Sequence, residues 1–249
     1  MENNVWKLPG TQPTDQWLIR DEVFAPQMRL RDHLIEAETD KVHTLQDDAV
    51  DAADECLDLV LSEISNDPGY KVASDSVMRP DGEVVGIDRS IPLLTLGRLV
   101  QNDFCLMQPG SEGHRLMGAI LCFPASWTLS EKIGKPMMEI HTPVSEYDEG
   151  LGRRVQRMFD MMQPEKMLWR ANAFRHEDPS LFHPRRESDP VSVRRGTRPG
   201  DYMRSERQTL RKLPRSQAIV FTIHTYVLKI SDLPTDAQAA MEAAKIKSG

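Results

Sequence analysis

The sequence predicts an α+β fold, in which a mostly antiparallel sheet carries flanking helices and an N-terminal helical region. Two observations support this class: the first 70 residues have apolar positions at helical spacing, and the later apolar runs are short and joined in pairs by turn residues. Strands and helices do not alternate regularly, which argues against a parallel sheet. We expect residues 1–70 to pack on a core of residues 71–231, followed by a helical tail over 232–249.

Helical spacing is clearest in the N-terminal region. Residues 17–45 read as helical, with an interruption near Pro26. In the next segment six apolar residues follow one helix face: Val50, Ala53, Leu57, Val60, Leu61 and Ile64. The turn formers Asp67, Pro68 and Gly69 end that helix. We expect these helices to cover the sheet.

Turn residues divide the centre of the chain into short elements. Residues 79–82, Arg-Pro-Asp-Gly, predict a turn, and residues 93–100 suggest a short helix. The apolar runs 104–108 and 114–123 are separated by Pro-Gly-Ser-Glu-Gly, which predicts a β-hairpin.

A helix and a long loop are predicted after this hairpin. Thr128 and Glu131 have the spacing of a capping box, with Thr128 as the N-cap and Glu131 reaching back to its backbone amide. Apolar spacing predicts a helix over 151–162. After a predicted strand at 167–173, the Arg- and Pro-rich residues 183–201 are expected to form a loop or lid.

The last part of the chain predicts a second hairpin and a terminal helix over 232–247. Residues 204–213 and 218–230 are joined by Pro-Arg-Ser, and the second run is rich in β-branched residues. If 204–213 is a strand, Arg207 and Arg211 point to one face and Arg204 and Glu206 to the other. The guanidinium groups match the carboxylates of haem propionates, or they are the solvated charges of an edge strand.

Composition indicates a globular protein. With 39% hydrophobic and 28% charged residues, the chain has no run near the roughly 18 apolar residues that span a bilayer. The first residues lack the pattern of a signal peptide, so we expect a cytoplasmic location. The three cysteines are widely spaced and odd in number, which favours buried thiols, with a haem thiolate at Cys105 or Cys122 as the alternative.

Charge is unevenly distributed along the chain, whose net charge is −7. Residues 36–67 hold eleven acids against the single base Lys41, whereas residues 185–215 hold ten bases against four acids. The basic stretch is either a solvated surface or a surface that binds ligand carboxylates or an acidic partner. Nucleic acid is a poor candidate, because the whole chain is acidic and few aromatic residues interrupt the basic stretch.

His141 has the most constrained surroundings of the seven histidines. No GxxxxGK[ST], GxGxxG or HExxH sequence occurs, so phosphate-loop, dinucleotide and zinc-protease sites are not indicated. Pro143 biases Thr142 toward an extended backbone and thereby limits the positions open to His141. A single, rigidly placed imidazole suits one axial bond to a haem iron, and the alternative is an ordinary surface or core histidine.

Four stretches resemble the signature blocks of one family. They are LGRLVQNDFCLM, LCFPASWTLSEKIGKP, IHTPV and RSERQTLRKLPRSQAIVFTIHTY, and they occur in order between about Trp17 and Tyr226. The family is that of the catalytic α subunit of haem-dependent oxidative N-demethylase, also called dimethylamine monooxygenase. The resemblance implies a PAS-like fold, a non-covalent b-type haem, and O₂-dependent oxidation of a small secondary amine to a primary amine and formaldehyde. It also implies electrons from NADPH through separate flavin and iron–sulfur subunits.

The resemblance also implies the residues of the site. His141 falls in the "IH-x-PV" block and is the expected axial ligand of the iron, with Lys132, Arg204 and Arg207 as further cofactor-binding residues. Glu206 and Tyr226 are the candidates to bind the amine, since a cationic amine favours a carboxylate or an aromatic face.

One departure from the family pattern concerns the shape of the expected substrate pocket. Family members often read "RxNW" where this chain has Arg-Ala-Asn-Ala at residues 170–173, so a tryptophan is missing. Two alternatives to a monooxygenase stay open at this point: a haem-binding PAS-like sensor, and a non-catalytic subunit without haem.

Overall fold

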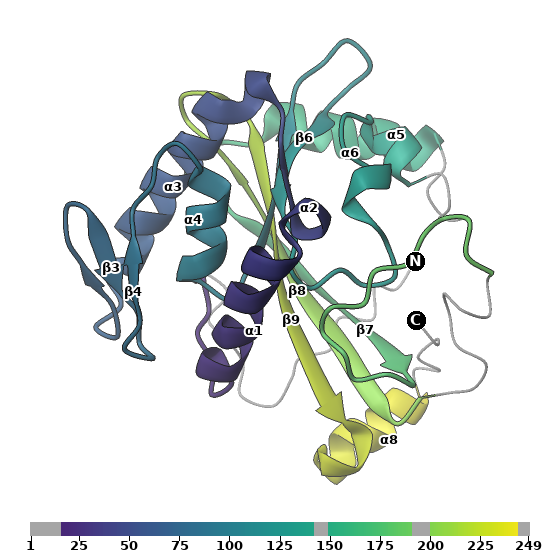
Figure 1. Cartoon of the computed structure of the whole chain (residues 1–249). Helices are drawn as coiled ribbons and strands as arrows, with labels where there is room; N and C mark the ends of the chain where they lie inside the picture. The colour runs from purple at the N-terminus through teal and green to yellow at the C-terminus, as the bar shows by residue number, and fades with distance from the viewer. Residues whose placement is uncertain (1–15, 142–148, 191–199, 244–249) are drawn as a thin grey trace.

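A six-stranded antiparallel sheet forms the centre of the structure (Figure 1). This computed structural model describes residues 16–141, 149–190 and 200–243. The strand order is β1-β6-β5-β9-β8-β7. The bounds are β1 His43–Leu45, β5 Asp103–Gln108, β6 Arg115–Ile120, β7 Leu168–His176, β8 Tyr202–Lys212 and β9 Ile219–Lys229. The α+β class and both predicted hairpins, β5–β6 and β8–β9, are confirmed.

Helices cover both faces of this sheet. On one side, which we call the N-terminal face, lie α1 (Phe24–Ala37), α2 (Thr39–Val42), η1 (Asp47–Ala49), α3 (Val50–Ile64) and α4 (Pro92–Leu99). Their apolar residues form one buried cluster with Phe104 of β5 and Val220 of β9. The other side, the α6 face, carries η2 (Leu129–Glu131), α5 (Met137–Ile140) and α6 (Glu149–Met161). There Phe159 of α6 packs in a cluster with Cys105 and Ile223.

The C-terminal part of the chain packs at the far end of the long hairpin. After η3 (Ile230–Asp232), α8 (Thr235–Ala243) lies beside the ends of β8 and β9 (Figure 1). Its Met241 is buried in a small cluster with Met203 and Leu233, against which Ala173 of β7 packs. No helix in the described ranges is both long enough and apolar enough to cross a membrane.

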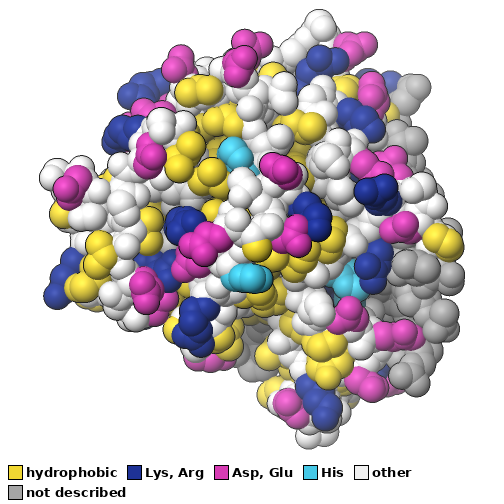
Figure 2. All heavy atoms as spheres, viewed as in Figure 1, with side chains coloured by type: hydrophobic (Ala, Val, Ile, Leu, Met, Phe, Trp, Pro, Cys, Tyr) yellow, Lys and Arg dark blue, Asp and Glu magenta, His cyan; other side chains and the backbone are white. Residues whose placement is uncertain are grey.

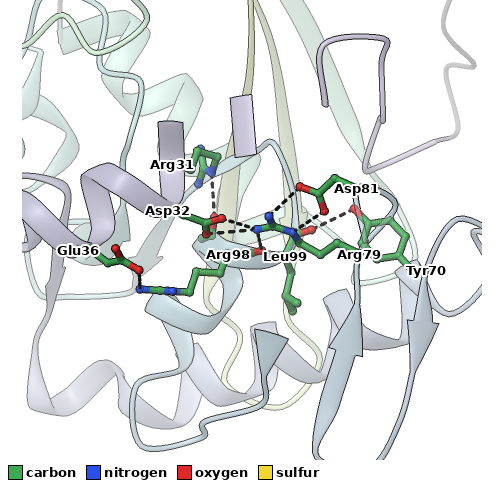
Figure 3. Close-up of polar contacts among 9 residues, drawn as sticks. Arg31, Asp32, Glu36, Tyr70, Arg79, Asp81, Arg98 and Leu99 are labelled. Carbon is green, nitrogen blue, oxygen red and sulfur yellow. Dashed lines mark hydrogen bonds and ion pairs between the residues drawn. The ribbon is translucent and has the colours of Figure 1, made fainter. Parts of the chain in front are cut away.

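A second, three-stranded sheet projects from the N-terminal layer. It consists of β2 (Lys71–Val72), β3 (Ser76–Met78) and β4 (Val84–Gly86). The predicted turn joins β3 to β4, and its Arg79 side chain is fully buried (Figure 3). Arg79 forms ion pairs with Asp81 at 2.8 Å and Asp32 at 3.0 Å and donates to the Arg98 carbonyl at 2.8 Å. One arginine therefore fixes the small sheet to α1 and α4.

The predicted helices over 50–64, 93–100 and 151–162 are confirmed, but the prediction for residues 17–45 is partly wrong. Pro26 does not interrupt a helix. It lies in the first turn of α1, where a missing backbone N–H costs no hydrogen bond. Residues 16–23 are not helical, and residues 43–45 join the sheet as β1.

The predicted capping box is also wrong. Thr128 precedes a 3₁₀ turn rather than an α-helix, and its side chain makes no cap hydrogen bond. Its hydroxyl donates to the Arg185 carbonyl at 2.8 Å, and the Glu131 carboxylate accepts the Glu187 backbone N–H at 3.0 Å. Both side chains bind the segment 185–187, which is distant in the sequence. The local sequence pattern therefore wrongly predicted a capping box.

Acidic and basic stretches meet on the surface. Arg215 lies 3.2 Å from Asp58 of α3, and Arg211 lies 3.5 Å from Glu63 of the same helix. Part of the basic stretch is thus neutralised by the acidic one. Figure 2 shows charged side chains of both signs intermixed over the face in view.

Candidate functional site

A row of polar side chains crosses strands β7, β8 and β9 on the α6 face. Successive residues of a strand point to opposite faces, and the register sets Glu206 opposite both Asn172 and Thr225. The residues that share this face are Arg170, Asn172, Arg204, Glu206, Gln208 and Thr225. Four of them, Arg204, Glu206, Gln208 and Thr225, are at most 8% exposed.

Two amide groups hold the carboxylate of Glu206. Oε2 of Glu206 accepts hydrogen bonds from Nε2 of Gln208 at 2.9 Å and from Nδ2 of Asn172 at 3.3 Å. Each amide is oriented from its other end. Arg170 Nε donates to Gln208 Oε1 at 2.8 Å, and the Glu206 backbone N–H donates to Asn172 Oδ1 at 3.0 Å. Glu206 is therefore fixed by a connected set of hydrogen bonds.

Arg204 is used mainly to bind backbone carbonyls. Nη2 donates to the Phe123 carbonyl at 2.7 Å and Nη1 to that of Leu181 at 3.1 Å. Its Nε lies 3.7 Å from Oε1 of Glu206, too far for a hydrogen bond. Burial lowers the pKa of Arg204, while the Glu206 charge opposes that shift. Arg204 thus joins β8 to two loops.

His141 caps the C-terminal end of α5 and is half-buried. Its Nδ1 lies 2.9 Å from the Met137 carbonyl. A carbonyl only accepts, so Nδ1 carries the proton and the lone pair of the neutral ring is on Nε2, as in most metal-binding histidines. Burial lowers the pKa of His141, the hydrogen bond to the Met137 carbonyl opposes that shift, and the charges of Lys132 and Arg170 lower the pKa further, which favours the neutral ring. Thr142 and Pro143 lie outside the described residues.

Lys132 lies next to His141 and is 5% exposed. Its ammonium donates to the carbonyl of Ile140 at 2.7 Å and forms an ion pair with Glu187. It joins the segment after η2, the end of α5 and the 185–187 segment. In this arrangement Lys132 supports the position of His141.

Arg207 and Tyr226 lie on the opposite side of the sheet from Glu206. Arg207 faces His224 in the register, and Ser205 faces Tyr226, so all four share the N-terminal face. Arg207 donates to the carbonyls of Trp17 at 3.0 Å and Gln16 at 2.5 Å. Burial raises the pKa of Tyr226 to about 12. The six predicted residues therefore form two groups on two faces.

The other candidate iron ligands are less suited than His141 to coordinate a haem iron. His224 is fully buried on the N-terminal face, and its Nε2 lies 3.0 Å from Asp21. His114 is 2% exposed, and its Nδ1 contacts Gln156. Burial raises the pKa of Cys122 to about 12 and that of Cys105 further, so both thiols stay protonated.

Four residues of the polar row were not predicted: Arg170, Asn172, Gln208 and Thr225. The two-residue period of a strand would have added Gln208 to Arg204 and Glu206. The others depend on the register between strands. The same register places Ala173, at the position of the missing tryptophan, on the N-terminal face beside α8. The departure in the family pattern therefore does not alter the polar row.

The side chains on the α6 face that could contact a haem are of the types that a haem requires. A neutral imidazole with its proton on Nδ1 suits an axial bond, and Arg170 is an exposed cation close enough to lower the pKa of that ring. Phe174 and Leu168, on the same face of β7, are 36% and 41% exposed and offer apolar contact. Among the described residues, no group of three or more His, Cys, Asp or Glu side chains has the arrangement of a metal site.

Comparison with known proteins gives one family match. The model of the family described as haem-dependent oxidative N-demethylase, alpha subunit-like, matches residues 10–249. A search of curated proteins found no match. The family match covers nearly the whole chain, including every element described above. The chain therefore belongs to the haem-dependent oxidative N-demethylase alpha subunit-like family.

Proposed function

We propose that the protein is a haem-dependent monooxygenase that removes a methyl group from a small secondary amine. The balanced reaction takes dimethylamine, O₂, two electrons and two protons to methylamine, formaldehyde and water. NADPH would supply the electrons through separate flavin and iron–sulfur subunits. The description "alpha subunit-like" supports the existence of partner subunits.

The observation that carries the proposal is the geometry of His141 within a family named for its haem. The Met137 carbonyl selects the tautomer that coordinates iron through Nε2. When bound, the haem supplies the activation of O₂. Lys132 and the carbonyl of Ile140 would hold the imidazole in place, and Arg170 is our candidate to bind a propionate.

A PAS-like core over residues 71–231 remains part of the proposal. Strands β5 to β9 lie in the order β6-β5-β9-β8-β7, with η2, α5 and α6 inserted between β6 and β7. That arrangement, a hairpin and a three-stranded meander joined by helices, supports the fold that the family resemblance implies. Residues 1–70 would cover this core, and residues 232–249 would follow as a tail.

We propose a direct role for Glu206 and supporting roles for Arg204, Arg207 and Tyr226, which the sequence predicted to bind the haem or the amine directly. Glu206 would contact the amine on the α6 face, where Asn172 and Gln208 hold it. Arg204 would support the site through the loops that it binds. Arg207 would act from behind the sheet by fixing β8 to residues 16 and 17. Tyr226 would act on the same face, where its ring lies 4.6 Å from that of His224.

Haem binding and the axial ligand can be tested together. The purified full chain should bind one haem per chain and show a Soret band, and His141→Ala should lose the haem or change its spin state. His33→Ala, an exposed histidine on α1, is the matched control and should leave the spectrum unchanged. Weak, non-saturable haem binding would reject the function, and an unchanged spectrum in His141→Ala would reject the ligand.

Turnover separates an enzyme from a sensor. With dithionite or a reductase as electron source, the haem-loaded chain should form formaldehyde from dimethylamine in proportion to O₂ consumed. A saturable Soret shift on adding the amine, without formaldehyde, would point to a sensor instead.

A further inference from the structure

Three neighbouring polar groups of the polar row, Arg204 Nε, Glu206 Oε1 and Thr225 Oγ1, are not joined by hydrogen bonds, and we call the place among them the gap. Oε2 of Glu206 already accepts two hydrogen bonds, but Oε1 lies 3.7 Å from Arg204 Nε. That Nε atom is buried and has no hydrogen-bond partner among the described residues, and the same holds for Oγ1 of Thr225. Arg204 is 2% exposed and Thr225 is 1% exposed. Buried polar atoms are rarely left unpaired, so the gap is suited to a small polar molecule.

The three residues around the gap share one face of the sheet. Arg204 and Glu206 are two residues apart on β8, and Thr225 lies opposite Glu206 on β9. Side chains at opposite positions of neighbouring strands are about 5 Å apart at Cβ, so the side chain of Thr225 is next to that of Glu206. The gap therefore presents an N–H donor, a carboxylate acceptor and a hydroxyl that can do either.

The charges around the gap are already balanced. Arg204 and Glu206 carry opposite charges, and Asp103, whose charge also acts on Arg204, forms a buried ion pair with Arg31 at 2.6 Å. A bound ammonium would add an uncompensated third charge, which is costly in a buried site. It would also leave Arg204 Nε without an acceptor, because an ammonium has only donors.

We propose that this gap binds the substrate amine in its neutral, deprotonated form. A neutral secondary amine has one N–H and one lone pair. The N–H donates to Oε1 of Glu206, and the lone pair accepts from Nε–H of Arg204. A tertiary amine lacks the donor and a quaternary ammonium lacks both, so the gap excludes them and accepts amines that keep an N–H, including secondary amines. The inference rests on the proposed function and specifies the protonation state of its substrate.

The number of protons released on binding tests this inference. In solution near pH 7.5 dimethylamine is almost entirely protonated, because alkylammonium groups have pKa values of about 10. Binding of the neutral form must release one proton per amine. Calorimetric titration of the haem-loaded full chain in two buffers of different ionisation enthalpy measures that number. A value close to one supports the proposal, and a value near zero overturns it.

Variants identify the gap as the binding site. Glu206→Gln should weaken dimethylamine binding by about 10-fold or more, since a charge-assisted hydrogen bond is lost. Thr225→Val keeps the shape of the side chain and should bind dimethylamine within about twofold of the wild type, because the one N–H and the one lone pair of the amine are bound by Glu206 and Arg204. Glu83→Gln, an exposed residue of the β3–β4 turn, is the matched control and should bind normally. Equal affinities in all three variants would overturn the proposal.

The haem result and the amine result remain distinguishable. The Soret band of each sample reports haem binding before the titration begins, whereas calorimetry reads the amine directly. Tetramethylammonium should give no saturable heat, and binding as tight as that of dimethylamine would contradict the inference. A protein that takes up no haem but releases one proton per bound amine would reject the proposed function and keep the amine site.

Discussion

The ammonium of Lys132 donates a hydrogen bond to the carbonyl of Ile140 at 2.7 Å, directly before His141. Its second partner is Glu187, from the segment that Thr128 and Glu131 also hold. One buried cation therefore connects the short α5 helix to a loop more than forty residues away in the chain. A helix of four residues has little stability of its own, so this contact is important for the position of His141.

Lys132→Met should therefore loosen the haem rather than unfold the protein. The variant keeps the aliphatic stem but loses a charge-assisted hydrogen bond, so we expect about tenfold faster haem loss. The rate of haem transfer to an excess of apo-globin measures this change. Lys135→Met, three residues away, is the control and should retain haem like the wild type. Equal rates in the two variants would show that Lys132 does not support His141.

Gly97→Ala should destabilise the N-terminal layer. A Cβ at Gly97 would lie 2.5 Å from Cγ1 of Ile120 and 3.0 Å from Cδ1 of Ile35, where α4 packs between β6 and α1. Overpacking of this kind costs about 1–3 kcal/mol of the free energy of unfolding. Chemical denaturation measures that loss.

The matched control for Gly97 is Gly86 in β4. A Cβ at Gly86 meets nothing within 4 Å, so Gly86→Ala should change the free energy of unfolding by less than about 0.5 kcal/mol. A loss in Gly97→Ala no larger than this would mean that the helix shifts to accept the methyl group.

Mild acid should destabilise the protein through His176. Burial, followed by the charges of Arg204 and His183, lowers the pKa of His176 from 6.5 to about 4. Below pH 6.5 the unfolded chain binds a proton that the folded chain does not, so stability is lost as the pH falls toward 4. The loss is at most about 1.4 kcal/mol per pH unit in this window.

His176→Gln should flatten this pH dependence. Free energies of unfolding measured between pH 7.5 and 5 should fall less steeply in the variant than in the wild type. His33→Gln, an exposed histidine, should leave the slope unchanged. Burial also lowers the pKa of His183. His183 should therefore maintain part of the pH dependence of stability in both variants. A slope identical to that of the wild type in His176→Gln would contradict the assignment.

The elements of this fold were largely predictable because their signals are local. Apolar spacing located α3 and α6, and turn residues located both long hairpins. Alternation along β8 also separated Arg204 and Glu206 from Arg207 before the structure was known. These features depend on residues that are near one another in the sequence.

The grouping of the site residues was not predictable, because it depends on register. Ser205 rather than Glu206 shares its face with Tyr226, and a shift of one residue would reverse this. The register is set at the turn after β8, where Gln217 has a positive φ of 59°. The capping box failed for a related reason, since the 185–187 segment competes for Thr128 and Glu131.

Ala173→Trp tests whether the missing tryptophan of the family pattern affects the amine site. Ala173 faces the N-terminal side and packs near Met203 and Leu233 under α8, whereas its neighbour Asn172 points to Glu206. We expect Ala173→Trp to change the free energy of unfolding by about 1–3 kcal/mol through repacking beside α8. Dimethylamine binding should remain within about twofold of the wild type. The substitution and the amine site lie on opposite faces of the sheet, so the coupling energy between them should be less than about 0.5 kcal/mol. Calorimetry and denaturation on the same samples measure both quantities.

Asn172→Ala is the paired variant and should show the opposite behaviour. It removes one of the two donors to Oε2 of Glu206, so amine affinity should fall about threefold to tenfold with a smaller change in stability. If Ala173→Trp instead weakened the amine and Asn172→Ala did not, the amine would bind on the N-terminal face. Tyr226 and Arg207 would then be its contacts. The haem would have to lie on that face as well, because the methyl group must reach the iron, so the assignment of His141 would be rejected too.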